Sequence, residues 1–209
     1  GAAEIGTCAR TAWELLRFAH TTGDSQALAA GLKALAFMDQ FEVPRAAQVW
    51  EVPVHTPDIL ASSDACEAYL EAYEITGKKP YLDRAVYWAW TGLPFLYLWD
   101  TPGFEYLRYA SIPVFGATWF KGSWFGRPVQ WNGLRYAYAV AQLAEYDSSL
   151  DWKRIARGIT VSGLYQQSEE DKDRALWPDS ISAIDQRKSG WIFAPRQILQ
   201  NVYWMMGMQ

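Results

Sequence analysis

Apolar positions along the chain recur mainly at intervals of three and four residues, the spacing of one face of an α-helix. Short polar or glycine-containing breaks divide this pattern into seven segments. The predicted helices cover residues 4–21, 25–41, 58–75, 80–93, a segment from about 132, 151–165 and 195–206. No stretch predicts a sheet of consequence, so the expected fold class is all-α.

The helices form a repeat. The stretches "AHTTGDSQALAAGLKAL" and "YEITGKKPYLDRAVYWA" align with an offset of 54 residues, which places Thr22-Gly23 on Thr76-Gly77. A weaker third copy places Asp147-Ser148-Ser149 at the same turn. Neighbouring units of such a repeat bury one another's apolar faces. The sequence therefore predicts three antiparallel αα hairpins and the first arm of a fourth, within one domain covering 1–209.

Alternating arms of the hairpins differ in composition. Alanines recur along one face of the helix after Asp58 and of the helix from about 132, and small side chains allow the close packing of an inner layer. The charged arms that follow them are expected outside. The short turns should lie at one end of the hairpins, and the long connections 42–57, 98–131 and 168–194 at the other. These connections hold seven of the twelve tryptophans, so we expect function there.

Composition narrows the possible ligands. The chain has 19 basic and 23 acidic residues, a net charge of −4 and no basic stripe, which argues against nucleic acid or a membrane surface as partner. Cys8 and Cys66 lack metal-ligand spacing and are interpreted as small buried side chains, with a single disulfide as the alternative. We expect no metal, because the local cluster of Glu51, His55 and Asp58 lacks a recognisable ligand spacing. We also expect no cofactor, and phosphate-binding glycine loops and nucleophile motifs are absent. Localisation is unknown; the protein would be secreted or periplasmic if a signal lies upstream.

The stretch "WFGRPVQWNGLRYAYA" at 124–139 combines indoles with uncharged amides just before a predicted helix. Buried indole and amide groups need polar partners, and a ligand with apolar faces and hydroxyl groups would supply them. We therefore predict ligand binding by Trp124, Arg127, Gln130, Trp131 and Asn132. The alternative is structural: Asn132 caps the helix and Trp131 packs between hairpins.

Tandem hairpins with the motif "YEITGKKPYLDRAVYWAW", short Thr-Gly turns and Trp-rich loops resemble the six-hairpin (α/α) toroid superfamily of glycoside hydrolases and related polysaccharide lyases. This resemblance implies a carbohydrate cleft where the long loops meet, with carboxylates for acid/base chemistry and indoles that stack on sugar rings. A full toroid needs six hairpins and this chain supplies about half. We therefore expect a partial toroid: a fragment, a truncated relative, or a unit completed by the rest of a longer chain or a second copy.

Within "VWEVPVHTPDIL" at 49–60, Glu51, His55 and Asp58 lie close together in a proline-punctuated loop. Carboxylates and an imidazole are the groups that glycosidic cleavage requires. Asp179, in "ALWPDSISA", is the fourth catalytic candidate, and we predict that Glu51 and Asp179 form the acid/base pair. The structural alternatives are an N-cap for Asp58, a packed His55, a solvated Glu51 and an Asx turn at Asp179. His20, beside a short turn, is expected to be structural.

The leading functional hypothesis is a glycoside hydrolase that binds an oligo- or polysaccharide. Further tryptophans predicted to stack on sugar are Trp50, Trp119 and Trp177. One alternative is a polysaccharide lyase of the same fold, with His55 or Tyr109 as base, Asn132 or Gln130 at a uronate carboxylate, and Arg127 assisting. The other is a non-catalytic helical-repeat module that binds glycan or protein.

Overall fold

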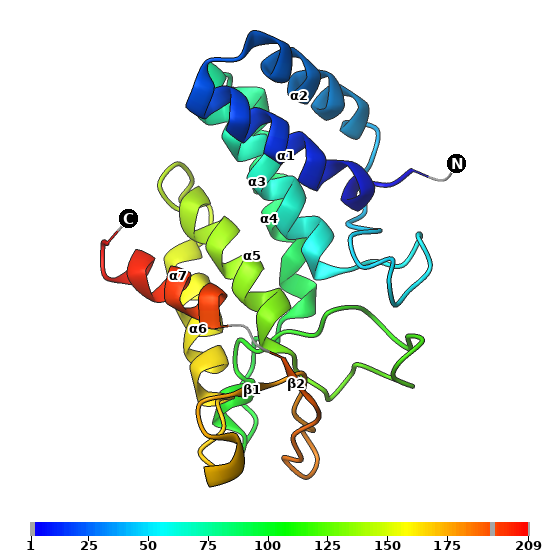
Figure 1. Ribbon diagram of the computed structural model, residues 1–209, viewed down its shortest axis with the longest axis vertical. Coiled ribbons are helices and arrows are strands. Elements are labelled where there is room, and N and C mark those ends of the chain that lie inside the picture. Colours follow the sequence, from blue (N-terminus) through cyan, green and yellow to red (C-terminus); the bar gives the residue numbers. More distant parts are fainter. Residues whose placement is uncertain (1–2, 193–194, 209) are drawn as a thin grey trace. The chain divides into compact units, whose positions relative to one another are not determined.

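The structure is a computed structural model that describes residues 3–192 and 195–208, and these residues form seven α-helices and one two-residue strand pair (Figure 1). The chain divides into two compact units, Gly1–Leu93 and Pro94–Gln209, and each is described by itself. No helix within the described ranges is long and apolar enough to cross a membrane. The predicted all-α class is confirmed.

The first unit consists of two hairpins (Figure 1, blue to cyan). The helices are α1 (Ile5–Thr22), α2 (Ser25–Met38), α3 (Ile59–Thr76) and α4 (Lys79–Gly92). Helix α1 packs against both α2 and α3, and α3 packs against α4. The 3₁₀ turn η1 (Leu93–Phe95) lies at the junction with the second unit. These bounds agree with the predicted helices to within three residues.

The two hairpin turns of this unit have the same geometry. Gly23 and Gly77 both adopt the left-handed conformation, with φ of 76° and 66°. Their N–H groups donate to Ala19 O at 2.8 Å and to Tyr73 O at 2.7 Å, which closes each helix. Glycine suits this position because it has no Cβ to clash at positive φ. The predicted alignment of the two turns is therefore confirmed.

Helix α3 is the most enclosed helix of the first unit. All of its residues from 59 to 72 are buried, which confirms its predicted place in the inner layer. Cys66 lies fully inside, where burial raises the pKa of its thiol well above the ordinary value. Cys8 on α1 is half-buried. Both cysteines are free thiols, so the alternative of a disulfide is wrong.

The second unit contains the third hairpin and the next arm. Its helices are α5 (Gln130–Leu143), α6 (Trp152–Tyr165) and α7 (Pro195–Met205), with α7 packed against both others. The 3₁₀ turns η2 (Glu105–Leu107) and η3 (Asp171–Asp173) lie in the connections. Strands β1 (Trp177–Pro178) and β2 (Trp191–Ile192) pair antiparallel, a small hairpin that the sequence pattern did not indicate.

Helix α5 begins two residues earlier than predicted. Val129 occupies the N-cap position, and its N–H donates to Ser111 O at 2.8 Å while Ser111 Oγ donates to Val129 O at 2.6 Å. This bridge holds the chain extended up to Val129, so the helix starts at Gln130. The alternative that Asn132 caps the helix is therefore wrong, because Asn132 lies within the first helical turn.

Candidate functional site

The connection before α3 is fixed against the start of α1. Gly6 N donates to Arg45 O at 2.8 Å, and Asp58 N donates to Pro44 O at 2.8 Å. A Cβ on Gly6 would lie 2.3 Å from Ala47 N, so only glycine permits this approach of the two backbones. The loop that carries Glu51, His55 and Asp58 therefore has a defined position on the first unit.

Asp58 holds the inner end of this loop. One carboxylate oxygen accepts from Ala61 N at 2.8 Å as the N-cap of α3, and the other accepts from Ala47 N at 2.9 Å and Gln48 N at 3.4 Å. Burial raises the pKa of Asp58 to about 7, against the opposing effect of these three N–H donors. With both oxygens engaged by backbone, Asp58 shapes the loop.

His55 lies at the outer edge of the same loop with its imidazole largely exposed. Its Nδ1 is 2.6 Å from Oε1 of Glu4, whose carboxylate is buried just before α1. Arg45 Nη1 approaches the same oxygen at 3.6 Å. An ionised carboxylate can only accept, so in the neutral imidazole this contact assigns the ring proton to Nδ1 and the lone pair to Nε2. The arrangement is suited to proton transfer at Nε2.

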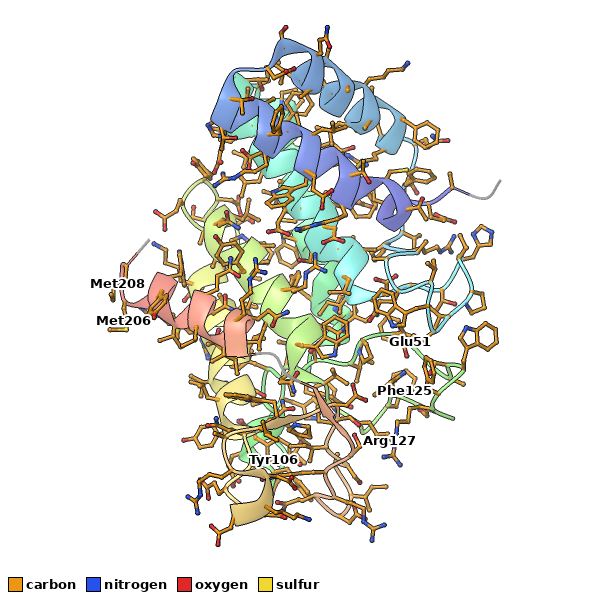
Figure 2. All side chains as sticks on the ribbon, viewed as in Figure 1. Glu51, Tyr106, Phe125, Arg127, Met206 and Met208 are labelled. Carbon is orange, nitrogen blue, oxygen red and sulfur yellow. The ribbon has the colours of Figure 1, made fainter. Side chains whose placement is uncertain are left out.

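Glu51, labelled in Figure 2, and its neighbour Trp50 lie in the middle of the 42–57 connection. The Glu51 residue is buried, and its N–H donates to Gln48 O at 3.1 Å. Trp50 is 51% exposed and offers an indole surface to solvent. A buried carboxyl group beside an exposed ring is consistent with the predicted roles of these two residues.

In the second unit, the predicted amides gather at the start of α5. Gln130 is 2% exposed, and its Nε2 donates to Pro178 O at 2.6 Å. Its Oε1 has no hydrogen-bond partner among the described residues. Asn132 is buried and Trp131 is half-buried beside it. A buried carbonyl oxygen without a donor is costly, and a ligand hydroxyl would satisfy it.

Asp179 follows Pro178 directly, which brings it next to the Gln130 contact. Its N–H donates to Gly190 O across the strand pair, so the backbone position is fixed. The carboxyl group is about half-buried, and this burial raises its pKa while the Lys121 charge acts in the opposite direction. A carboxyl that keeps its proton to higher pH is suited to act as a general acid.

The predicted tryptophans of the second unit separate into buried and exposed rings. Trp177 is 8% exposed, donates from Nε1 to Gly163 O at 2.9 Å, and packs in a cluster with Leu134. Trp124 is also buried. Trp119, in contrast, is 69% exposed, as a stacking ring should be. The indole of Trp177 therefore contributes to the core of this unit.

Phe120 and Phe125 of the 98–131 connection did not stand out in the sequence, whereas Arg127 was predicted to bind ligand. Phe120 and Phe125 are 70% and 56% exposed, and Figure 2 marks Phe125 and the exposed Arg127. The loop backbone is held by Tyr97, whose hydroxyl oxygen accepts from Gly126 N at 2.8 Å. Trp119, Phe120 and Phe125 thus provide the exposed rings of this segment.

The structure assigns the candidate residues to two separate groups. Glu51, His55 and Asp58 belong to the first unit, and Asp179 with the residues of 119–132 belongs to the second. The proposed pairing of Glu51 with Asp179 stays a prediction. Sequence reasoning missed Glu4 as the partner of His55, since an acidic residue ahead of a helix signals only a favourable helix start.

A possible metal cluster lies at the other end of α1. Ligand atoms of His20, Glu71 and Glu74 lie within 4.8 Å of one another. His20 Nδ1 is 2.5 Å from Glu71 Oε1, and Arg17 Nη1 is 3.4 Å from the other oxygen of the same carboxylate. The guanidinium already supplies positive charge at this point. We assign this group the structural role of joining α1 to α3.

Comparisons with known proteins place the fold. No family model matches the sequence, and no curated protein matches it. D-mannose isomerase aligns with 98% of this chain and 54% of its own length, at a TM-score of 0.67 and 10% identity. Cellobiose 2-epimerase from Bacillus thermoamylovorans B4167 aligns with 86% of this chain and 48% of its own, at a TM-score of 0.59 and 13% identity.

The chain spans about half the length of these solved structures, as the hairpin count predicted. At such low identity the likeness concerns the fold and not the chemistry. The resemblance stated from the sequence is confirmed at that level. The chain consists of tandem antiparallel αα hairpins, and its fold is similar to about half of each of these two solved structures.

Proposed function

We propose that the chain is part of a sugar-converting enzyme in which His55 transfers a proton at the carbon next to a sugar carbonyl. Two solved structures of similar fold are a D-mannose isomerase and a cellobiose 2-epimerase, which supports carbohydrate as the substrate class. Isomerisation and epimerisation at carbon 2 both begin with removal of that proton. The hydrolytic reaction expected from the sequence becomes the second candidate.

The contact between His55 and Glu4 carries this proposal. Nε2 of the neutral imidazole takes the proton from carbon, and the electron pair of the C–H bond moves to form an enediolate. The buried Glu4 carboxylate, 2.6 Å from Nδ1, orients the ring and stabilises the imidazolium that forms. Return of the proton to carbon 1, together with transfer of the hydroxyl proton from the oxygen on carbon 2 to the oxygen on carbon 1, gives the isomer. Delivery of a proton to the opposite face of carbon 2 by a second acid gives the epimer.

Sugar binding in the second unit is proposed to use an exposed ring and a buried acceptor. The indole of Trp119 offers an apolar face for stacking on a pyranose. The Oε1 atom of Gln130 accepts from a sugar hydroxyl, which satisfies an oxygen that otherwise has no donor among the described residues. Both features suit a neutral sugar.

Glycosidic hydrolysis is favoured by one observation, the raised pKa of Asp179. A half-buried carboxyl group whose pKa is raised by burial keeps its proton to higher pH than an exposed one and is better suited to donate to a leaving glycosidic oxygen. Glu51 would then serve as the second carboxylate of the predicted pair. This alternative predicts loss of hydrolysis in both Glu51→Gln and Asp179→Asn.

The test is incubation of the protein with mannose, glucose or cellobiose in deuterated water, followed by proton NMR. Proton transfer predicts incorporation of deuterium at carbon 2 together with formation of the isomer or epimer. Hydrolysis of oligosaccharides instead produces new reducing ends, and β-elimination of a uronate polymer produces an ultraviolet-absorbing double bond.

His20 provides a matched control for His55. Both imidazoles pair through Nδ1 with a buried glutamate of the first unit, at 2.5 and 2.6 Å, but at opposite ends of α1. We expect His55→Gln to reduce deuterium incorporation at least a hundredfold and His20→Gln to leave it near wild type. Equal losses in the two variants, or no incorporation in the wild-type protein, would contradict the proposal.

A further inference from the structure

A cavity of about 690 Å³ lies in the second unit between α6 and the segment around η2. Its volume is within the range of small-molecule binding sites. The lining residues are Glu105, Tyr106, Arg108, Tyr109, Arg154, Arg157, Gly158, Val161, Ser162 and Tyr165. Tyr109 was named above as a possible base of the lyase alternative, and none of the other lining residues is assigned above to proton transfer, hydrolysis or sugar stacking.

The wall of this cavity has an unusual backbone conformation. Tyr109 adopts φ of 66°, in the left-handed region that non-glycine residues rarely occupy, and its N–H donates to Tyr97 O at 2.7 Å. Its ring lies against Gly158 of α6, where a Cβ would be 2.3 Å from the ring. Ser162 Oγ donates to Tyr106 O at 2.6 Å and ties the same segment to α6. Conformations of this kind concentrate at binding and catalytic sites.

The charges around the cavity are predominantly positive. Arg108 is held by Asp100, with Nη1 at 2.9 and 3.0 Å from its two carboxylate oxygens. Arg154 and Arg157 lie three residues apart on α6 and form no salt bridge with any described residue. Glu105 is the acidic residue of the lining. In a chain of net charge −4, two such arginines at one cavity indicate an anionic ligand.

A residue that lines the cavity also carries a buried polar group without a partner. The hydroxyl oxygen of Tyr106, a residue marked in Figure 2, is buried and makes no hydrogen bond with the described residues. Leaving such a group without a partner in a folded protein is costly. An acidic ligand in the cavity would supply the counter-charge for Arg154 and Arg157.

We propose that this cavity binds a small anionic sugar, whose carboxylate or phosphate group pairs with Arg154 and Arg157. The tyrosine rings of the lining contact the sugar ring. The proposal that the ligand is anionic rests on the arginines alone, whereas the proposal that it is a sugar rests on the proposed function. The site is distinct from the residues proposed for catalysis, so an anionic sugar bound here would act as a second ligand.

The experiment is isothermal titration calorimetry of the protein with glucuronate and with glucose 6-phosphate, using neutral glucose and inorganic phosphate as comparison ligands. We expect at least one acidic sugar to bind more tightly than either comparison ligand, and added sodium chloride to weaken that binding. The glucuronate and glucose 6-phosphate arms distinguish a carboxylate from a phosphate.

Two double variants locate the binding. Arg154→Gln/Arg157→Gln should weaken the affinity at least tenfold, because both guanidinium partners of the anion are lost. Arg187→Gln/Arg196→Gln removes the same charge from exposed positions of the second unit outside the cavity and should change the affinity less than twofold. Absence of binding by both acidic sugars, or equal weakening in both double variants, would overturn the proposal. Since the readout is binding and not turnover, failure of the proposed isomerisation leaves this result interpretable.

Discussion

Replacing Asp58 with alanine removes the acceptor of three backbone N–H groups. Those of Ala61 and Ala47 are bonded at 2.8 and 2.9 Å, and that of Gln48 at 3.4 Å. A buried donor left without a partner costs about 1–3 kcal/mol, and loss of an N-cap about 1 kcal/mol. Because the third bond is long, we expect Asp58→Ala to lower the free energy of unfolding of the first unit by about 2–4 kcal/mol.

Asp58→Asn separates the two structural roles of this carboxylate, the N-cap of α3 and the acceptor for the 47–48 backbone. Asparagine can still cap α3 through its carbonyl oxygen, but its amide NH₂ would face the N–H groups of Ala47 and Gln48. The loss of stability should therefore be smaller than in Asp58→Ala. Hydrogen exchange measured by mass spectrometry should show faster exchange at residues 44–48 and little change in the middle of α3.

The raised pKa of Asp58 also predicts a pH dependence. The folded protein keeps this proton up to about pH 7, whereas the unfolded chain releases it near pH 4. Between these values the folded state binds more protons, so this group's contribution to stability is complete below about pH 4 and is lost as pH rises through about 7. The Asp58→Asn variant should lack this component of the pH profile.

Urea unfolding followed by far-ultraviolet circular dichroism measures these effects in the full chain, with hydrogen exchange assigning them to the first unit. Asp24 is the matched control, since it caps α2 through Ala27 N at 2.8 Å but is exposed. We expect Asp24→Ala to cost about 1 kcal/mol. If Asp58→Ala cost no more than Asp24→Ala, the reasoning from buried donors would be refuted.

Three further outcomes are expected. Gly6→Ala should destabilise the protein by about 2 kcal/mol or more in a thermal melt, because its Cβ would lie 2.3 Å from the backbone nitrogen of Ala47; an unchanged melting temperature would contradict this. Trp177→Phe should cost about 0.5–1.5 kcal/mol in urea unfolding, because the buried bond from Trp177 Nε1 to Gly163 O is lost while Gln166 N still donates to that oxygen; a cost near zero would count against that bond. Trp119→Ala should change stability by less than about 0.5 kcal/mol yet reduce the fluorescence response to oligosaccharides, and an unaltered response would remove Trp119 from the sugar site.

The sequence alone was sufficient to predict the helices and the turns that repeat between them. A helix period, a cap such as Asp58 and a left-handed glycine such as Gly23 act over a few residues, so their effect can be recognised without knowing the rest of the fold. The same local signals predicted the hairpins. The number of hairpins in turn predicted that the chain spans about half the length of the solved structures that it resembles. Where the start of α5 was misplaced, the cause was a contact between Val129 and Ser111, eighteen positions apart.

The chemistry of the candidate sites was decided by tertiary structure. Glu4 reaches His55 across 51 positions, and no local pattern connects an acidic residue before one helix with an imidazole before another. Trp119 and Trp177 both lie in long loops, and the sequence does not distinguish them. In the structure Trp119 is exposed, whereas Trp177 is buried against α5. Burial and charge pairing depend on which distant segments pack together. The residue type therefore limits the roles that a side chain can have, and the tertiary packing determines which of these roles it has.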